Sequence, residues 1–195
     1  MKRTLSSAMV LAMALAATVS AAAADRVLRA EVELAAPVED VWRAWTTEEG
    51  VKTFFAKGAH IEPQVDGAYE IFFNPAGAPG KRGADGMRVL AFEAPRRLAF
   101  TWNAPPTIPA IRGQRTMVVI ELEATGPRRT RLRFTHLGWG EGKDWDAAYD
   151  YFDHAWGAVV LPRLKRRFES GPLDLDTDIK LPPVAPSLRL TLRGD

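Results

Sequence analysis

The sequence predicts an α+β domain in which seven antiparallel strands form a sheet, two short helices follow the first strand, and a long C-terminal helix packs against the sheet. Three observations lead to this prediction. Residues 130–136 alternate between apolar and polar side chains, and a glycine-punctuated loop and a helical pattern through Phe168 follow them. Residues 26–34 alternate in the same way. The region from 59 to 124 consists of short apolar segments separated by turn residues.

The first strand is expected at 26–34, because its apolar side chains fall on one face and its charged side chains on the other. Pro37 suits the first turn of a helix, and apolar residues from Val38 to Trp45 then recur at the spacing of one helical face. Thr46 and Glu49 have the spacing of a capping box, which predicts that a second short helix starts there.

Six further strands are expected at 59–64, 68–73, 86–93, 97–102, 115–124 and 130–136. Short turns such as Asp66-Gly67 and Gly126-Pro127 join several of them, so consecutive strands should form hairpins and run antiparallel. The connections at 74–86 and 103–113 are long and rich in Gly or Pro. Loops of this kind often border a binding site.

The last helix is expected to begin with Asp144 as its N-cap. Acidic residues in its first half and basic residues after Arg163 match the helix dipole. Pro162 lacks a backbone N–H group, so we expect a kink there. One face is apolar and consists of Trp145, Ala148, Tyr149, Phe152, Trp156, Val159 and Val160.

Residues 1–24 have the composition of a cleaved signal peptide. Lys2 and Arg3 precede an apolar run at 8–19, and small residues at 20–24 provide a cleavage site before Asp25. The run is shorter than the ~20 residues that span a bilayer. We therefore expect a periplasmic or secreted protein with no stable membrane insertion after cleavage, a domain at 25–170, and a Pro-rich tail at 171–195 that either adds an edge strand or stays apart from the sheet.

The charge and cysteine content exclude several classes of function. The chain has 26 Lys and Arg against 24 Asp and Glu, and removal of Lys2 and Arg3 with the signal leaves 24 of each. A neutral domain has no overall attraction for nucleic acid, so no nucleic-acid partner is expected. The sequence contains no Cys, which excludes disulfides, thiol catalysis and thiolate metal sites.

Candidate catalytic residues are few. Only Ser170 and Ser187 follow the signal, and no G-x-S-x-G motif is present, so a serine triad is not expected. His60, His136 and His154 lack metal-ligand spacing, and neither a metal site nor a cofactor is expected. His136 lies on the same face of the predicted strand at 130–136 as Leu132 and Phe134, so its side chain should point inward. There it could bond a ligand or act as a general base, or it could be a core histidine bonded to a carbonyl or a Trp indole, which we favour.

Five stretches resemble the START-like (SRPBCC) superfamily, in the branch named for activators of a heat-shock chaperone ATPase: residues 41–46, 67–72, 97–102, 135–140 and 145–156. The resemblance covers about residues 26–170. It implies a helix-grip fold, in which the sheet curls around the long helix and an apolar cavity lies between them. It places the following residues around that cavity: Trp45, Phe55, Tyr69, Ile71, Trp102, Leu132, Phe134, His136, Trp139, Tyr149, Phe152 and Trp156.

Three functions follow from these expectations. The leading one is an exported domain that binds a small hydrophobic or aromatic ligand without transforming it. The second is a cyclase or dehydratase that uses His136 as its base, assisted by Tyr69 or Glu70. The third is a protein-interaction module, similar to a co-chaperone, that uses the loops at 74–86 and 103–113. The sequence does not identify its protein partner. Trp139, between two glycines, could gate the cavity or cap the end of the sheet.

Overall fold

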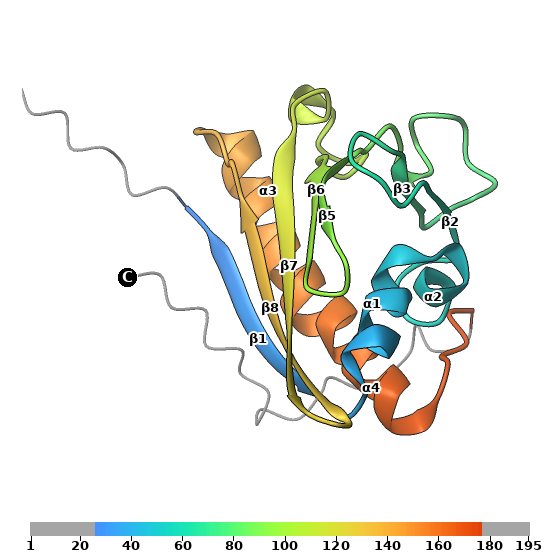
Figure 1. Cartoon of the computed structure of the whole chain (residues 1–195). Coiled ribbons are helices and arrows are strands. Elements are labelled where there is room, and N and C mark those ends of the chain that lie inside the picture. The colour runs from blue at the N-terminus through green and yellow to red at the C-terminus, as the bar shows by residue number, and fades with distance from the viewer. Residues whose placement is uncertain (1–25, 177–195) are drawn as a thin grey trace, which may run out of the picture.

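The computed structural model describes residues 26–176. Its larger sheet is antiparallel and contains, in spatial order, β1 (Leu28–Leu34), β8 (Arg129–Leu137), β7 (Thr116–Gly126), β6 (Arg97–Trp102) and β5 (Val89–Glu93). A smaller sheet contains β2 (Gly58–Ile61), β3 (Tyr69–Phe72) and β4 (Gly83–Ala84). A long C-terminal helix lies across one face of the larger sheet (Figure 1), which is the predicted helix-grip arrangement.

The larger sheet has one buried and one charged face. Along β1 the burial alternates residue by residue, and Val32 pairs with Leu132, which in turn pairs with Leu122. On the opposite face Arg131 and Arg133 of β8 lie between glutamates of β1 and β7, with N···O distances between 3.0 and 3.5 Å. Exposed ion pairs contribute little stability each. Alternation of the two charges nevertheless keeps this face close to neutral.

The described residues form eight strands rather than the predicted seven. The additional strand, β4, lies within the connection at 74–86 and pairs with the end of β3. Gly83 makes this pairing possible, because its φ is +155° and a Cβ atom there would lie 2.2 Å from the carbonyl oxygen of Ile71. A two-residue strand has no periodicity to detect, so the sequence pattern could not reveal it.

The two short helices are α1 (Val38–Thr46) and α2 (Glu48–Lys52). The predicted capping box at Thr46 is wrong by one residue. The Thr47 side chain accepts the N–H of Gly50 at 2.9 Å, whereas the Thr46 hydroxyl donates to the carbonyl of Trp42 within α1. Adjacent threonines compete for the same cap, and Thr47 has the extended backbone that an N-cap requires.

The C-terminal helix consists of α3 (Lys143–His154), a π-helical segment η2 (Ala155–Val160) and α4 (Leu161–Ser170). It begins at Lys143 with Gly142 as N-cap, so the predicted N-cap Asp144 already lies in the first turn. The π-helical segment ends two residues before Pro162, where we expected a kink. Proline cannot donate to the carbonyl four residues earlier and clashes with it. A wider turn, in which the N–H of Leu161 bonds the carbonyl of Trp156, accommodates it.

The chain after α4 returns to the domain. Leu173 and Leu175 are buried, and the N–H of Leu173 donates to the carbonyl of Thr53 at 2.9 Å. Contacts with the domain therefore continue past Ser170. The predicted signal at 1–24 and the alternating segment at 187–193 lie outside the described residues. Among residues 26–176, no helix combines the length and the apolar composition that are needed to cross a membrane.

Candidate functional site

A pocket of about 260 Å³ lies beside the C-terminal helix, between η2, β4 and the segment that follows β6. Its volume is near the lower end of the range for small-molecule sites, which suits a ligand of one or two rings. Most of its wall is apolar. The lining residues that provide this wall are Phe55, Phe73, Ala84, Trp102, Pro105, Pro106, Phe152, Ala155, Trp156, Val159 and Val160.

Two aromatic side chains at the pocket are exposed. Phe73, just after β3, is 46% exposed, and Tyr151 of α3 is 48% exposed. Both belong to the pocket lining. Large apolar side chains in water are common on any surface, but a pair on one pocket forms a continuous apolar path from solvent to its wall.

Four predicted ligand-binding residues do line the pocket: Phe55, Trp102, Phe152 and Trp156. Their rings contact one another, with centroid distances of 5.9 Å between Phe55 and Trp102 and 5.4 Å between Trp102 and Trp156. Phe152 stacks on Trp156 at 6.4 Å. Such mutual contacts hold the rings in place, so this wall is formed before any ligand arrives.

Five other predicted residues lie in the packed core and not on the pocket: Trp45, Tyr69, Ile71, Phe134 and His136. The Tyr69 hydroxyl donates to the carbonyl of Trp45 at 2.9 Å, and burial raises the pKa of Tyr69 above its usual value. The Trp45 indole N–H has no hydrogen-bond partner among the described residues, and its ring packs edge-on against Phe54. Aromatic side chains therefore fill much of the space inside the grip.

His136 is fully buried, and both of its ring nitrogens have partners. The Trp156 indole donates to Nδ1 at 3.1 Å, so the proton is on Nε2, which lies 2.7 Å from the Thr116 hydroxyl. The Thr116 hydroxyl donates in turn to the carbonyl of Trp102. Burial lowers the pKa of His136 to about 3. His136 is thus a neutral core histidine bonded to a Trp indole, and it orients the ring that forms the pocket wall.

Trp139 and Tyr149 form a half-buried cluster at the end of the sheet. The Trp139 indole donates to the carbonyl of His136 at 3.1 Å, and its ring meets Tyr149 at 5.1 Å. The residue that follows Trp139 must be glycine, because a Cβ atom at Gly140 would lie 2.3 Å from the Trp145 indole nitrogen. Neither Trp139 nor Tyr149 belongs to the pocket lining. These contacts are those expected if Trp139 caps the end of the sheet. They give less support to the alternative, in which Trp139 gates the pocket.

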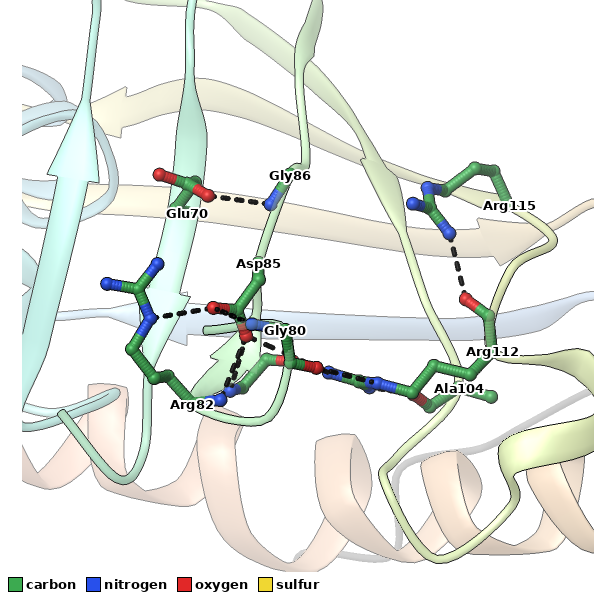
Figure 2. A network of polar contacts seen from close by, with 9 residues as sticks. Glu70, Gly80, Arg82, Asp85, Gly86, Ala104, Arg112 and Arg115 are labelled. Atoms are coloured by element: carbon green, nitrogen blue, oxygen red, sulfur yellow. Dashed lines mark hydrogen bonds and ion pairs between the residues drawn. The ribbon is translucent and has the colours of Figure 1, made fainter. Parts of the chain in front are cut away.

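Two long loops are joined by one side chain, Arg112, which follows the 3-10 helix η1 (Pro109–Ile111). Figure 2 shows Arg112 reaching toward the hairpin that carries Asp85. Its guanidinium donates to the carbonyls of Gly80 and Gly83 in one loop and of Ala104 in the other. It therefore fixes the part of the pocket wall that comes from these loops.

Asp85 organises the first of those loops. Burial alone would raise the pKa of its carboxyl group. Hydrogen bonds from Arg82 and from the N–H groups of Gly80 and Gly83 outweigh this and lower the pKa below its usual value. Arg112 lies 3.8 Å away and adds a second cation. The carboxylate is consequently ionised and structural (Figure 2).

No sequence pattern predicted the polar part of the pocket, which consists of Asn103, Arg112, His154 and Arg163. Only the prediction that the loops at 74–86 and 103–113 border a site pointed toward this region. His60 lies elsewhere, beside Glu48 and Glu62. Within residues 26–176, no group of three or more His, Cys, Asp or Glu side chains is placed so that it could hold a metal ion.

Comparisons with known proteins agree with this architecture. The family model described as Activator of Hsp90 ATPase homolog 1-like protein matches residues 35–169, which is more than half of the sequence. No curated protein matches the chain. Many solved structures share the fold. The protein MLL2253 from Mesorhizobium loti is 26% identical, with a TM-score of 0.59, and the match covers 76% of this chain and 100% of that one.

Two more distant structures share the fold. The Aha1 dimer from Colwellia psychrerythraea is 23% identical with a TM-score of 0.57, and the match covers 75% of this chain and 98% of that one. PFC0360w, an HSP90 activator from Plasmodium falciparum, is 14% identical with a TM-score of 0.54, and the match covers 71% and 94% of the two chains. At these identities the similarity establishes the fold alone.

Proposed function

The chain belongs to the family of Activator of Hsp90 ATPase homolog 1-like proteins, and from this premise we propose that it binds a small hydrophobic or aromatic molecule in the pocket beside its C-terminal helix and releases it unchanged. The observation that supports this proposal most strongly is the aromatic wall of Phe55, Trp102 and Trp156, which borders a pocket of about 260 Å³. An apolar wall with a few polar groups is the usual construction of a ligand site.

Catalysis by His136 has less support than binding. A general base must reach the proton that it removes, yet His136 is fully buried, lies outside the pocket lining and uses both ring nitrogens within the core. Tyr69 is bonded to the carbonyl of Trp45, and Glu70 accepts the N–H of Gly86 at 2.6 Å. The three residues proposed for an enzyme are therefore engaged in structural contacts.

Protein interaction is a second candidate function. Its support is the exposed pair Phe73 and Tyr151, next to loops that Arg112 holds in one conformation. We do not extend the ATPase-activating role in the family's description to this chain, because the predicted signal peptide would separate the protein from a cytosolic chaperone. An interaction role predicts that removing Phe73 and Tyr151 abolishes protein capture, whereas a substitution that fills the pocket leaves protein capture unchanged.

Pocket binding is tested by filling the pocket. Val159→Trp should occupy the space beside Trp156 and weaken binding of prodan, a neutral naphthalene dye, by at least about tenfold. The measurement is the rise in prodan fluorescence on titration with protein. Ala158→Trp is the matched control, because Ala158 is the preceding residue, exposed and outside the lining. Equal prodan affinity of wild type and Val159→Trp would refute the proposed site.

Export is the other part of the proposal. The full-length chain, produced in a bacterium with a functional export pathway, should be recovered outside the cytoplasm with Asp25 as its first residue. N-terminal sequencing and intact mass of the exported fraction check this. Replacing Leu11 and Leu15 by Arg should interrupt the apolar run and leave the uncleaved chain in the cytoplasm. Recovery of the unmodified wild-type chain, beginning at Met1, only in the cytoplasm would contradict it.

A further inference from the structure

One edge of the larger sheet has no partner strand among residues 26–176. β1 is the outermost strand and pairs with β8 on its inner side (Figure 1). Along its outer side, the backbone N–H and C=O groups of Leu28–Leu34 can pair with a further strand. Main-chain bonds of this kind depend little on sequence, so charge and the alternation of apolar residues decide which segment fits.

Rows of charged side chains cross the exposed face of the sheet and end at this edge. Directly paired residues of neighbouring strands project from the same face. In one row the charge changes sign at every strand, and its members from β5 to β1 are Glu93, Arg97, Glu121, Arg133 and Glu31. The next row has the same order from β7 to β1 and consists of Glu123, Arg131 and Glu33. Both rows end with a glutamate, so the complementary neighbour of β1 is a strand that presents a basic side chain.

The C-terminal segment 187–193, which lies outside the described residues, has this pattern in its sequence. It reads Ser-Leu-Arg-Leu-Thr-Leu-Arg, and its Leu-Arg-Leu-Thr run matches the Leu-Arg-Phe-Thr run at 132–135 in β8. In β8 that run pairs with β1 and places Arg133 opposite Glu31. The segment therefore repeats the pattern of the strand that β1 already accepts on its inner side.

We propose that residues 187–193 pair with the outer side of β1 as a sixth, antiparallel strand of the larger sheet, with Arg189 opposite Glu31. The three leucines of the segment then share the face of Leu28 and Val32, and a shift by one residue would turn them to solvent. A shift by two residues in either direction would place an arginine opposite Arg29, which is a repulsive pair. The added strand covers an edge that could otherwise pair with a second copy of the chain.

The connection is long enough for this pairing. Ser187 follows Asp176, the last described residue, by eleven residues, and three of the residues between them are proline. An extended proline-rich chain spans ~3.1 Å per residue, so this connection covers about 34 Å. The helix α4 contacts β1 and, with ten residues, is about 15 Å long. The chain can therefore return along α4 to the end of β1 at Leu34, from which an antiparallel strand would start.

The test uses disulfide formation, because the chain has no Cys of its own. Opposed residues of antiparallel strands have Cα atoms about 4.5–5.5 Å apart, a separation that a disulfide can bridge. Two double variants of the full chain place cysteines at the two ends of the proposed pairing: Glu33→Cys with Ser187→Cys, and Arg29→Cys with Thr191→Cys. Each is equilibrated with oxidised and reduced glutathione. Intact mass after alkylation gives the ratio of intramolecular disulfide to dithiol, and peptide mapping identifies the bridge.

The matched controls exchange the same four cysteines. They are Glu33→Cys with Thr191→Cys and Arg29→Cys with Ser187→Cys, which would be opposed only in a parallel strand. The proposed pairs should give a disulfide-to-dithiol ratio at least about tenfold higher than the exchanged pairs, because pairing raises the effective concentration of the two thiols. Equal ratios, or a higher ratio for the exchanged pairs, would overturn the inference. Disulfides mainly between two chains, seen as a dimer on non-reducing electrophoresis, would assign the edge to a second copy and also overturn it.

The charge pairing is tested in the variant with cysteines at positions 29 and 191. Arg189→Glu places a second glutamate opposite Glu31 and should lower the disulfide-to-dithiol ratio about threefold or more. Lys180→Glu makes the same change of charge outside the paired segment and should leave the ratio unchanged. Equal effects of the two substitutions would assign the result to net charge and overturn the proposed register.

Discussion

Trp156→Ala is expected to lower the free energy of unfolding by about 3–5 kcal/mol, as is typical for truncation of a buried Trp. Trp156 is almost fully buried, and its ring contacts Phe134 at 4.8 Å and Phe55 at 5.5 Å. Its indole also bonds His136, so removal leaves Nδ1 without a donor. The same ring forms the wall of the pocket, and prodan should bind the variant at least about tenfold more weakly.

A matched pair of variants separates the two roles of Trp156. Trp156→Phe keeps an aromatic ring but removes the N–H group, so it should lose less stability, about 1–3 kcal/mol, and retain most prodan binding. Tyr151→Ala, at an exposed position of the lining, should weaken prodan binding with a loss of stability below about 1 kcal/mol. Urea unfolding and prodan titration measure both quantities. Wild-type stability of Trp156→Ala would show that the ring is not part of the core.

Acidification is expected to destabilise the protein through His136. Its pKa is about 3 in the folded state and about 6.5 in the unfolded state. Above pH 6.5 the imidazole is neutral in both states and has no effect. Between pH 6.5 and 3 the unfolded state binds the proton and the folded state does not, so stability falls as pH falls. The total loss is on the order of 5 kcal/mol.

The measurement is the free energy of unfolding in urea at pH 7, 6, 5 and 4. His136→Gln retains a donor and an acceptor for Thr116 and Trp156, and its curve should be flatter than that of wild type below pH 6.5. Phe134→Leu is the control, because it perturbs the same core without a titratable group and should follow the wild-type slope. Parallel curves for wild type and His136→Gln would show that the imidazole gains access to protons in the folded state.

Periodic segments made most of the fold predictable. The alternation of Leu28, Ala30 and Val32 places them on the buried face of β1, and the parity of Leu132, Phe134 and His136 places them on the same face of the sheet. The errors are at positions where local hydrogen bonds decide the structure. Examples are the cap at Thr47, the two-residue strand at Gly83 and the π-helical segment before Pro162.

The site was predictable only in part, because parity reveals which face a side chain is on and not whether space remains beside it. Phe134 and Trp156 both point inward, but Phe134 is packed in the core and Trp156 borders the pocket. Asn103 and Arg112 lie in loops without periodicity. Their proximity arises from hydrogen bonds to Gly80 and Ala104, and no pattern in a single segment contains that information.

The π-helical segment before Pro162 also fixes the phase between the two halves of the C-terminal helix. One residue advances an α-helix by about 100° and 1.5 Å. The wide turn already holds one residue more than an α-helical turn, so deleting one residue between Ala155 and Val160 can restore a regular α-helix and keep the phase of α4. Inserting one more residue would instead rotate α4 by about 100° relative to α3. Leu161 and Leu164, which are buried, would then leave their packing sites, and the charged side of α4 would take their place.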